Sequence, residues 1–205
     1  MDLRLLLISH ASTAAQRAGR MPADGDPLDA RSIAETEAAH TRLTLPADAA
    51  VFVSPAVCAR ETASALGLTA TLDEGLADMN YGRWCGRRLV EIANEAPQDF
   101  AAWTRDPDAT PHGGESFSQL VLRVGAWLDA LDVATTKPLK EGTAASASNG
   151  PRHVVAVTHA PWLRAALVHA LEAPPAVFPR IEIAPLSVVE LRRSRRGWTW
   201  WPAGS

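Results

Sequence analysis

Two histidines stand just beyond the ends of short apolar runs, and their imidazole rings could act as nucleophiles, acids or bases. His10 follows the run at residues 3–8, and His159 follows the run at residues 154–157. Short apolar runs that lead into helix-compatible sequence are typical of buried parallel strands in an α/β sheet. Ligands bind outside the carboxyl ends of such strands. The pattern therefore predicts that the two histidines share one pocket.

The elements that must position these histidines alternate along the chain. Apolar runs predict strands at residues 3–8, 51–53, 68–72 and 154–158. Apolar residues at helical spacing predict helices at residues 29–43, 55–66, 116–133 and 161–171, the first with Asp29 as its N-cap. A final hairpin is expected from strands at residues 186–191 and 198–201. The alternation favours an α/β domain.

Length, charge and cysteine content narrow the class of protein. A chain of 205 residues fits a single domain, and its net charge of −3 predicts no general attraction to nucleic acid or to anionic membranes. No run approaches the roughly 18 apolar residues that span a bilayer, and the first residues lack a signal-peptide pattern. Cys58 and Cys85 are the two cysteines, which fits a reducing compartment. We therefore expect a soluble, cytoplasmic protein whose oligomeric state the sequence does not indicate.

Two segments fall outside the regular alternation. Residues 76–110 combine loop and helix patterns with Trp84, Trp103 and prolines, and we expect a cap-like insertion over the strand ends there. Residues 137–152 are rich in Ala, Ser, Gly and Thr without periodicity, which indicates a flexible surface loop. Neither segment marks a domain boundary, so residues 1–205 are expected to form one domain.

A series of short motifs runs along nearly the whole chain. In order they are Ser9–Thr13, Arg17–Arg20, Asp26–Leu28, Ser54–Ala63, Leu76–Gly86, Gly113–Ser116 and Val157–Ala160. Each alone is weak, but in this order and spacing they resemble the histidine phosphatase superfamily, the group that contains cofactor-dependent phosphoglycerate mutase. The resemblance implies a phosphoglycerate mutase-like fold, with a mostly parallel central sheet and helices on both faces.

The resemblance also implies a role for individual residues. His10 would attack the phosphoryl group and carry it as phosphohistidine, Asp78 would protonate the leaving oxygen, and His159 would donate hydrogen bonds to the phosphoryl oxygens. The implied substrate-binding residues are Ser9, Ser12, Thr13, Arg20, Cys58 and Thr158. The implied activity is phosphomonoester hydrolysis on a small phosphorylated metabolite. No metal or other cofactor is implied, because cationic side chains normally hold the phosphate.

The chain departs from the family's pattern at the charged positions of the phosphate pocket. Ser9 and Cys58 stand where the family has arginines. Arginine suits phosphate because its planar fork donates two parallel hydrogen bonds. The loss of one such donor costs about 10²–10³ in rate in well-studied enzymes. Arg20 or Arg83 would have to supply a replacement charge.

Three functional hypotheses follow from these departures. The first is a phosphatase that acts through His10, for which His10→Ala should abolish turnover. The second is a catalytically inactive relative that serves as a binding or regulatory protein. The third is a transition-metal pocket built from His10, His159, Asp78 and Cys58, which are ligand types that such ions accept. The local spacing of these four residues does not itself indicate a metal site.

Overall fold

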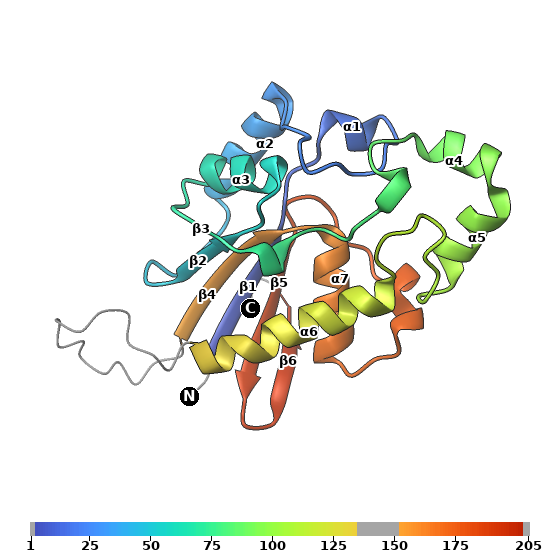
Figure 1. Ribbon diagram of the computed structural model, residues 1–205. Helices are drawn as coiled ribbons and strands as arrows, with labels where there is room; N and C mark the ends of the chain where they lie inside the picture. Colours follow the sequence, from blue (N-terminus) through green and yellow to red (C-terminus); the bar gives the residue numbers. More distant parts are fainter. Residues whose placement is uncertain (1–2, 135–151, 203–205) are drawn as a thin grey trace.

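The computed structural model describes residues 3–134 and 152–202. A six-stranded sheet lies at its centre, in the strand order β3-β2-β4-β1-β5-β6 (Figure 1). The strands are β1 (Leu3–Ser9), β2 (Ala50–Val53), β3 (Thr71–Leu72), β4 (Arg152–Thr158), β5 (Val188–Ser194) and β6 (Gly197–Trp201). The first four strands in the order pair in parallel, whereas β5 and β6 form the antiparallel hairpin at one edge. The expected α/β fold with a mostly parallel sheet is confirmed.

Helices connect the strands and cover the sheet. The α-helices are α1 (Ala14–Arg17), α2 (Ala30–His40), α3 (Val57–Ala65), α4 (Leu89–Glu95), α5 (Pro97–Arg105), α6 (Phe117–Ala134) and α7 (Ala160–Ala170). Short 3₁₀ helices are η1 (Glu74–Leu76), η2 (Gly82–Trp84) and η3 (Pro175–Arg180). Within the described ranges, no helix is both long enough and apolar enough to cross a bilayer.

Both faces of the sheet are buried, which explains the continuous apolar sequence of the central strands. On β1, Leu5 and Leu7 point toward the core formed with α6 and α7. Leu6 and Ile8 point the other way and pack in a second core with α3. Because side chains alternate across a strand, one apolar run supplies both cores. The helices on both faces that the resemblance implies are present.

The start of α3 differs from the sequence expectation. The sequence predicts a helix that begins at Pro55, but α3 begins at Val57. The Ser54 amide donates to the Val157 carbonyl at 3.0 Å, and this bond keeps the chain extended beyond the end of β2. Ala56 then serves as the N-cap with extended backbone angles. The bond matters because it holds Ser54 beside the end of β4, next to His159.

Two other boundaries also test the sequence expectations. Asp29 caps α2 as expected, since its Oδ1 accepts a hydrogen bond from the Ser32 amide at 2.9 Å. The strand expected at residues 68–72 is shorter, because the Leu68 amide still bonds to the Ala63 carbonyl at the end of α3. Of residues 68–72, only Thr71 and Leu72 pair with β2.

The segment at residues 76–110 contains η2, α4 and α5. Figure 1 shows α4 beside the loop that carries α1. The Leu89 amide donates to the Gly19 carbonyl at 2.8 Å, and the Met21 amide donates to the Arg87 carbonyl at 2.8 Å, so the two segments are joined by backbone bonds. Of the loop expected at residues 137–152, Arg152 is the first residue of β4, and the remainder lies outside the described residues.

Candidate active site

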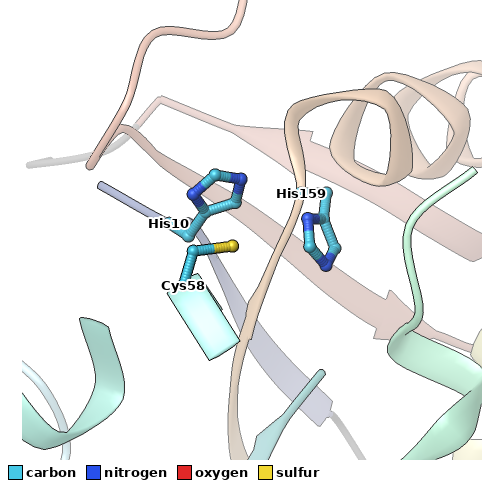
Figure 2. Close-up of side chains that lie close together, drawn as sticks. All are labelled: His10, Cys58 and His159. Carbon is cyan, nitrogen blue, oxygen red and sulfur yellow. The ribbon is translucent and has the colours of Figure 1, made fainter. Parts of the chain in front are cut away.

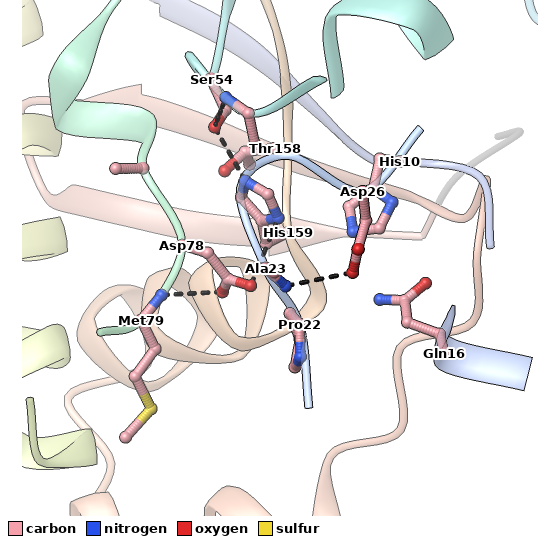
Figure 3. Close-up of polar contacts among 12 residues, drawn as sticks. His10, Gln16, Pro22, Ala23, Asp26, Ser54, Asp78, Met79, Thr158 and His159 are labelled. Atoms are coloured by element: carbon pink, nitrogen blue, oxygen red, sulfur yellow. Dashed lines mark hydrogen bonds and ion pairs between the residues drawn. The ribbon is translucent and has the colours of Figure 1, made fainter. Parts of the chain in front are cut away.

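His10 and His159 leave the sheet side by side. β1 and β4 pair in parallel with Ser9 opposite Thr158, and the His10 amide donates to the Thr158 carbonyl at 2.8 Å. The two imidazole rings lie edge to face with their centroids 4.9 Å apart, and both residues are buried. The structure therefore places both histidines in one pocket, as the strand ends predict (Figure 3).

The hydrogen bond of His10 determines which of its ring nitrogens is available. Nδ1 lies 2.7 Å from the Ala11 carbonyl oxygen, which can only accept, so Nδ1 carries the hydrogen of the neutral ring. The Ala11 amide in turn donates to Thr62 Oγ1 at 3.0 Å, which holds this turn in place. Burial, followed by the effect of His159, lowers the pKa of His10 to about 4. At pH 7 the ring is neutral and Nε2 offers a free lone pair.

His159 is held through its other nitrogen. Its Nε2 lies 2.8 Å from the hydroxyl of Ser54, at the end of β2 (Figure 3). Its Nδ1 lies 3.4 Å from Asp78 Oδ2 and is buried without a hydrogen-bond partner in the described part of the chain. Burial lowers the pKa of His159 to about 4. The Ser54 contact therefore fixes the ring, and Nδ1 faces the pocket without a hydrogen bond to the described residues.

Asp78 supplies a carboxyl group whose side chain is 7% exposed. Its Oδ1 accepts a 2.7 Å hydrogen bond from the Met79 amide. Arg123 donates to the main-chain carbonyl of Asp78 at 3.1 Å and thereby holds the loop from its far side. Burial raises the pKa of Asp78 to about 7, although the Met79 amide and His10 act in the opposite direction. A carboxyl group that keeps its proton near neutral pH can serve as a general acid.

The thiol of Cys58 points between the two imidazole rings from the first turn of α3 (Figure 2). The donor atoms of Cys58, His10 and His159 all lie within 4.8 Å of one another, and all three residues are buried. Burial and then the Asp78 carboxylate raise the pKa of the Cys58 thiol to about 12, so the thiol is neutral. A small uncharged group thus occupies the position that the resemblance assigns to an arginine.

A small cavity between these side chains is rich in carboxylates. Asp24, Asp26 and Asp78 line it together with the two histidines and Cys58, and its described lining contains no lysine or arginine. Its volume is about 10 Å³, close to the space that one water molecule occupies. Sequence reasoning did not select Asp24 or Asp26 as site residues. The one sequence feature that could have identified them as site residues is their place in the loop that contains the Asp26–Leu28 motif.

A wider cleft of about 410 Å³ opens beside His10. Ser9, Ser12 and Arg20, three of the expected substrate-binding residues, line this cleft. Arg20 donates to the Gly86 carbonyl at 2.9 Å, which ties its charge to the wall of the cleft. This is the side from which a substrate can reach His10.

Arg17 is a further cation at the cleft that sequence reasoning did not select. Its guanidinium is already engaged, since it donates to the hydroxyls of Ser12 and Ser32 and pairs with the Asp29 carboxylate. The positive charge of Arg17 is therefore largely balanced before any ligand binds.

Three other residues that the sequence suggests for the site, Thr13, Thr158 and Arg83, differ in where they lie relative to the two cavities. Thr13 reaches the small cavity and caps α1 through its hydroxyl. Thr158 lines neither cavity, because its hydroxyl donates to the Leu76 carbonyl at 2.7 Å. Arg83 is largely exposed, pairs with Asp99 at 3.5 Å and lines neither cavity.

The motifs and this geometry are matched by a known family. The profile of the histidine phosphatase superfamily (branch 1) matches residues 5–201. The chain belongs to the histidine phosphatase superfamily. Its strand order, its paired histidines and its acid-bearing loop are thus features of a superfamily member.

Known proteins of this superfamily cover the chain to different extents. A bifunctional protein of Mycobacterium tuberculosis is 31% identical over 195 residues, which are 91% of this chain and 50% of the relative. The chain therefore spans about half the length of that curated relative. An adenosylcobalamin/alpha-ribazole phosphatase of Salmonella typhimurium is 29% identical over 136 residues, which are 63% of this chain and 67% of the relative. The solved structure of mycobacterial hydrolase 1 has a TM-score of 0.81 at 25% identity and covers 100% of this chain and 99% of that one.

In this histidine phosphatase superfamily member, the small cavity beside His10 is lined by acidic side chains. Ser9 and Cys58 stand where the resemblance implies arginines, and neither Arg20 nor Arg83 lines the small cavity. The carboxylates of Asp24, Asp26 and Asp78 remain. The small cavity therefore contains a neutral histidine and a carboxyl group that holds its proton near neutral pH, and its described lining has no cationic side chain.

Proposed function

We propose that the protein is a phosphomonoester phosphatase that transfers a phosphoryl group to His10. The observation that carries this proposal is the hydrogen bond from His10 Nδ1 to the Ala11 carbonyl, because it leaves Nε2 unprotonated on a residue that lines the 410 Å³ cleft. The neutral state of the ring at pH 7 supports the same role. Family membership and the phosphatase among the relatives agree with this activity.

The proposed reaction has two steps. Nε2 of His10 forms a bond to phosphorus while the bond to the leaving oxygen breaks, and Asp78 gives its proton to that oxygen so that an alcohol departs. Water then attacks the phosphorus of the phosphohistidine while its bond to Nε2 of His10 breaks, Asp78 takes a proton from the water, and inorganic phosphate leaves. In the tautomer in which Nε2 of His159 accepts from the Ser54 hydroxyl, its Nδ1 carries a hydrogen and can donate to a phosphoryl oxygen.

The cleft favours a small phosphorylated molecule as substrate. Its walls combine the Arg20 guanidinium with apolar side chains of Met21, Leu89 and Trp103. Such walls suit a substrate with an uncharged or apolar group beyond the phosphate. We further propose a cytoplasmic location, since Cys58 and Cys85 are both free.

Hydrolysis of an aryl phosphate by the metal-free protein tests this function. A chelator is present throughout, and wild type is compared with His10→Ala. His153→Ala is the matched control, because His153 lies at the opposite end of β4 and pairs with Asp48 on the surface. Turnover by wild type and His153→Ala but not by His10→Ala, with phosphate found on His10 by mass spectrometry, supports the proposal. Equal turnover by His10→Ala would refute it.

A second candidate is a binding protein without catalytic activity. The observation that favours it is the carboxylate-lined cavity, because three acidic side chains oppose the approach of a phosphate dianion. This candidate predicts that wild type and His10→Ala are both inert toward a panel of aryl and alkyl phosphates. Both variants would nevertheless unfold cooperatively at similar temperatures.

A further inference from the structure

The pocket at the strand ends contains the donor atoms of a metal site. His10, His159 and Cys58 come from the ends of β1 and β4 and from the start of α3, so the fold itself brings them together (Figure 2). Their donor atoms lie within 4.8 Å of one another, and all three are buried. We propose that these three side chains bind one divalent transition-metal ion, of the zinc class.

The ring nitrogens that face the pocket are the ones left free by other bonds. His10 Nδ1 is engaged by the Ala11 carbonyl and His159 Nε2 by the Ser54 hydroxyl. Metal-binding histidines almost always have such a second contact, which fixes the ring and leaves the other nitrogen for the ion. The atoms available to an ion are His10 Nε2 and, in the tautomer whose Nε2–H donates to the Ser54 hydroxyl oxygen, His159 Nδ1. The latter is a buried polar atom with no hydrogen-bond partner among the described residues.

The third donor, the Cys58 thiol, determines which class of metal ion the site favours. A thiolate with two imidazoles is a set that zinc and cobalt accept, whereas magnesium and calcium prefer oxygen ligands. Tetrahedral zinc with bonds of about 2.0–2.3 Å needs donor atoms about 3.5 Å apart, so the cluster must contract by about 1 Å. Rotation of the Cys58 side chain and small shifts of the two rings can supply this movement. On binding, a metal–sulfur bond forms and the thiol proton passes to solvent.

The charge around the three donors favours a cation. Asp24, Asp26 and Asp78 line the cavity with them, and no lysine or arginine is found in its described lining. The space of about 10 Å³ suits a single ion, whereas a phosphoryl group needs considerably more room. Asp78 Oδ2 lies 3.4 Å from His159 Nδ1 and is therefore a candidate for a fourth ligand.

Metal binding and phosphoryl transfer exclude each other, because both use Nε2 of His10. The metal would therefore switch the enzyme off, a consequence that rests on the proposed phosphatase function. The metal site itself does not depend on that function. Its test must therefore use a signal other than activity.

Titration of the metal-free protein with Co²⁺ provides that signal. We expect one equivalent to bind and to give a sulfur-to-cobalt charge-transfer band that added Zn²⁺ removes. Cys58→Ala should lose the band and bind at least about 100-fold more weakly. Cys85→Ala is the matched control, because Cys85 is also a free cysteine but is exposed and outside the cluster, and it should behave as wild type. No binding by folded wild type, or an unchanged band in Cys58→Ala, would overturn the proposal.

X-ray absorption of zinc-loaded wild type covers the case in which Cys58→Ala does not fold. One sulfur and two imidazole nitrogens are expected in the first shell. A shell that contains only oxygen and nitrogen overturns the assignment of Cys58. The spectrum is recorded on unaltered protein, so it is independent of whether the protein hydrolyses any phosphate.

Discussion

Replacement of Cys58 by arginine tests whether a missing positive charge limits phosphoryl transfer. The Cys58 thiol lies within 4.8 Å of one ring nitrogen of His10 and one of His159. A guanidinium roughly 4 Å from a phosphoryl charge gains about 4 kcal/mol per unit charge at an effective dielectric constant of about 20. Loss of a single oxyanion donor costs about 10²–10³ in rate, or about 2.7–4 kcal/mol. The electrostatic gain from the guanidinium is therefore of the same size as the cost of one lost donor.

The carboxylates of the pocket reduce this gain. The new guanidinium would also pair with Asp24, Asp26 and Asp78, which line the same cavity. A cation beside Asp78 lowers the pKa of its carboxyl group, so less of the acid form is present at pH 7. We therefore expect Cys58→Arg to raise kcat/KM by about 10–100-fold, below the full value of an oxyanion donor. The pH of maximal activity should move downward.

The assay compares wild type, Cys58→Arg and Cys58→Gln on an aryl phosphate in the presence of a chelator. Glutamine is the control because it lengthens the side chain without adding charge. Overfilling this buried site should cost about 1–3 kcal/mol in both variants, which thermal unfolding measures. If Cys58→Arg is folded and no faster than Cys58→Gln, the missing charge is not what limits the reaction.

Three further predictions follow from the same structure. One equivalent of Zn²⁺ should inhibit hydrolysis and a chelator should restore it, whereas Mg²⁺ should have no effect; inhibition by both ions would contradict a site built on a thiolate. Asp78→Asn should slow hydrolysis of an alkyl phosphate by about 10²–10⁴ but affect a good aryl leaving group much less, and equal losses would rule out proton donation to the leaving oxygen. The pKa of Glu190 is lowered because hydrogen bonds from Arg4 and Arg192 outweigh its burial, so these bonds stabilise the fold above the ordinary pKa of glutamate and lose their effect as the pH falls through the lowered value. Urea unfolding of wild type and Glu190→Gln at pH 7 and at pH 3 should therefore show a difference in free energy that shrinks at the lower pH, and a constant difference would count against the ion pairs.

The shared pocket of His10 and His159 could be predicted from the sequence because strand ends are a strong local signal. Each histidine follows a run that is buried on both faces, and parallel strands bring such ends to one edge of the sheet. The position of Cys58 followed from its place in the Ser54–Ala63 motif. What the sequence does not show is the direction of the thiol, which depends on α3 beginning at Val57.

The acidic character of the pocket could not be predicted. Asp24 and Asp26 lie in a loop without periodicity, where no pattern indicates which side chains face inward. For Thr158 the sequence suggests the wrong contact. Its place beside His159 suggests that it contacts a ligand, but its hydroxyl donates to the Leu76 carbonyl. In both cases the orientation is set by contacts with distant segments, which a local pattern does not record.

The proposed metal site and the lack of phosphate-binding charge would both follow from a cysteine at position 58, where the resemblance implies an arginine. An arginine at Cys58 would place a cation beside Asp78 and repel a second one, whereas a thiol leaves the carboxylates unbalanced and adds a soft donor. Because both ligands need Nε2 of His10, affinity for zinc and rate of phosphoryl transfer should change in opposite directions across variants of Cys58. Two variants in which both quantities rise together would show that charge at this position does not govern the choice between the two ligands.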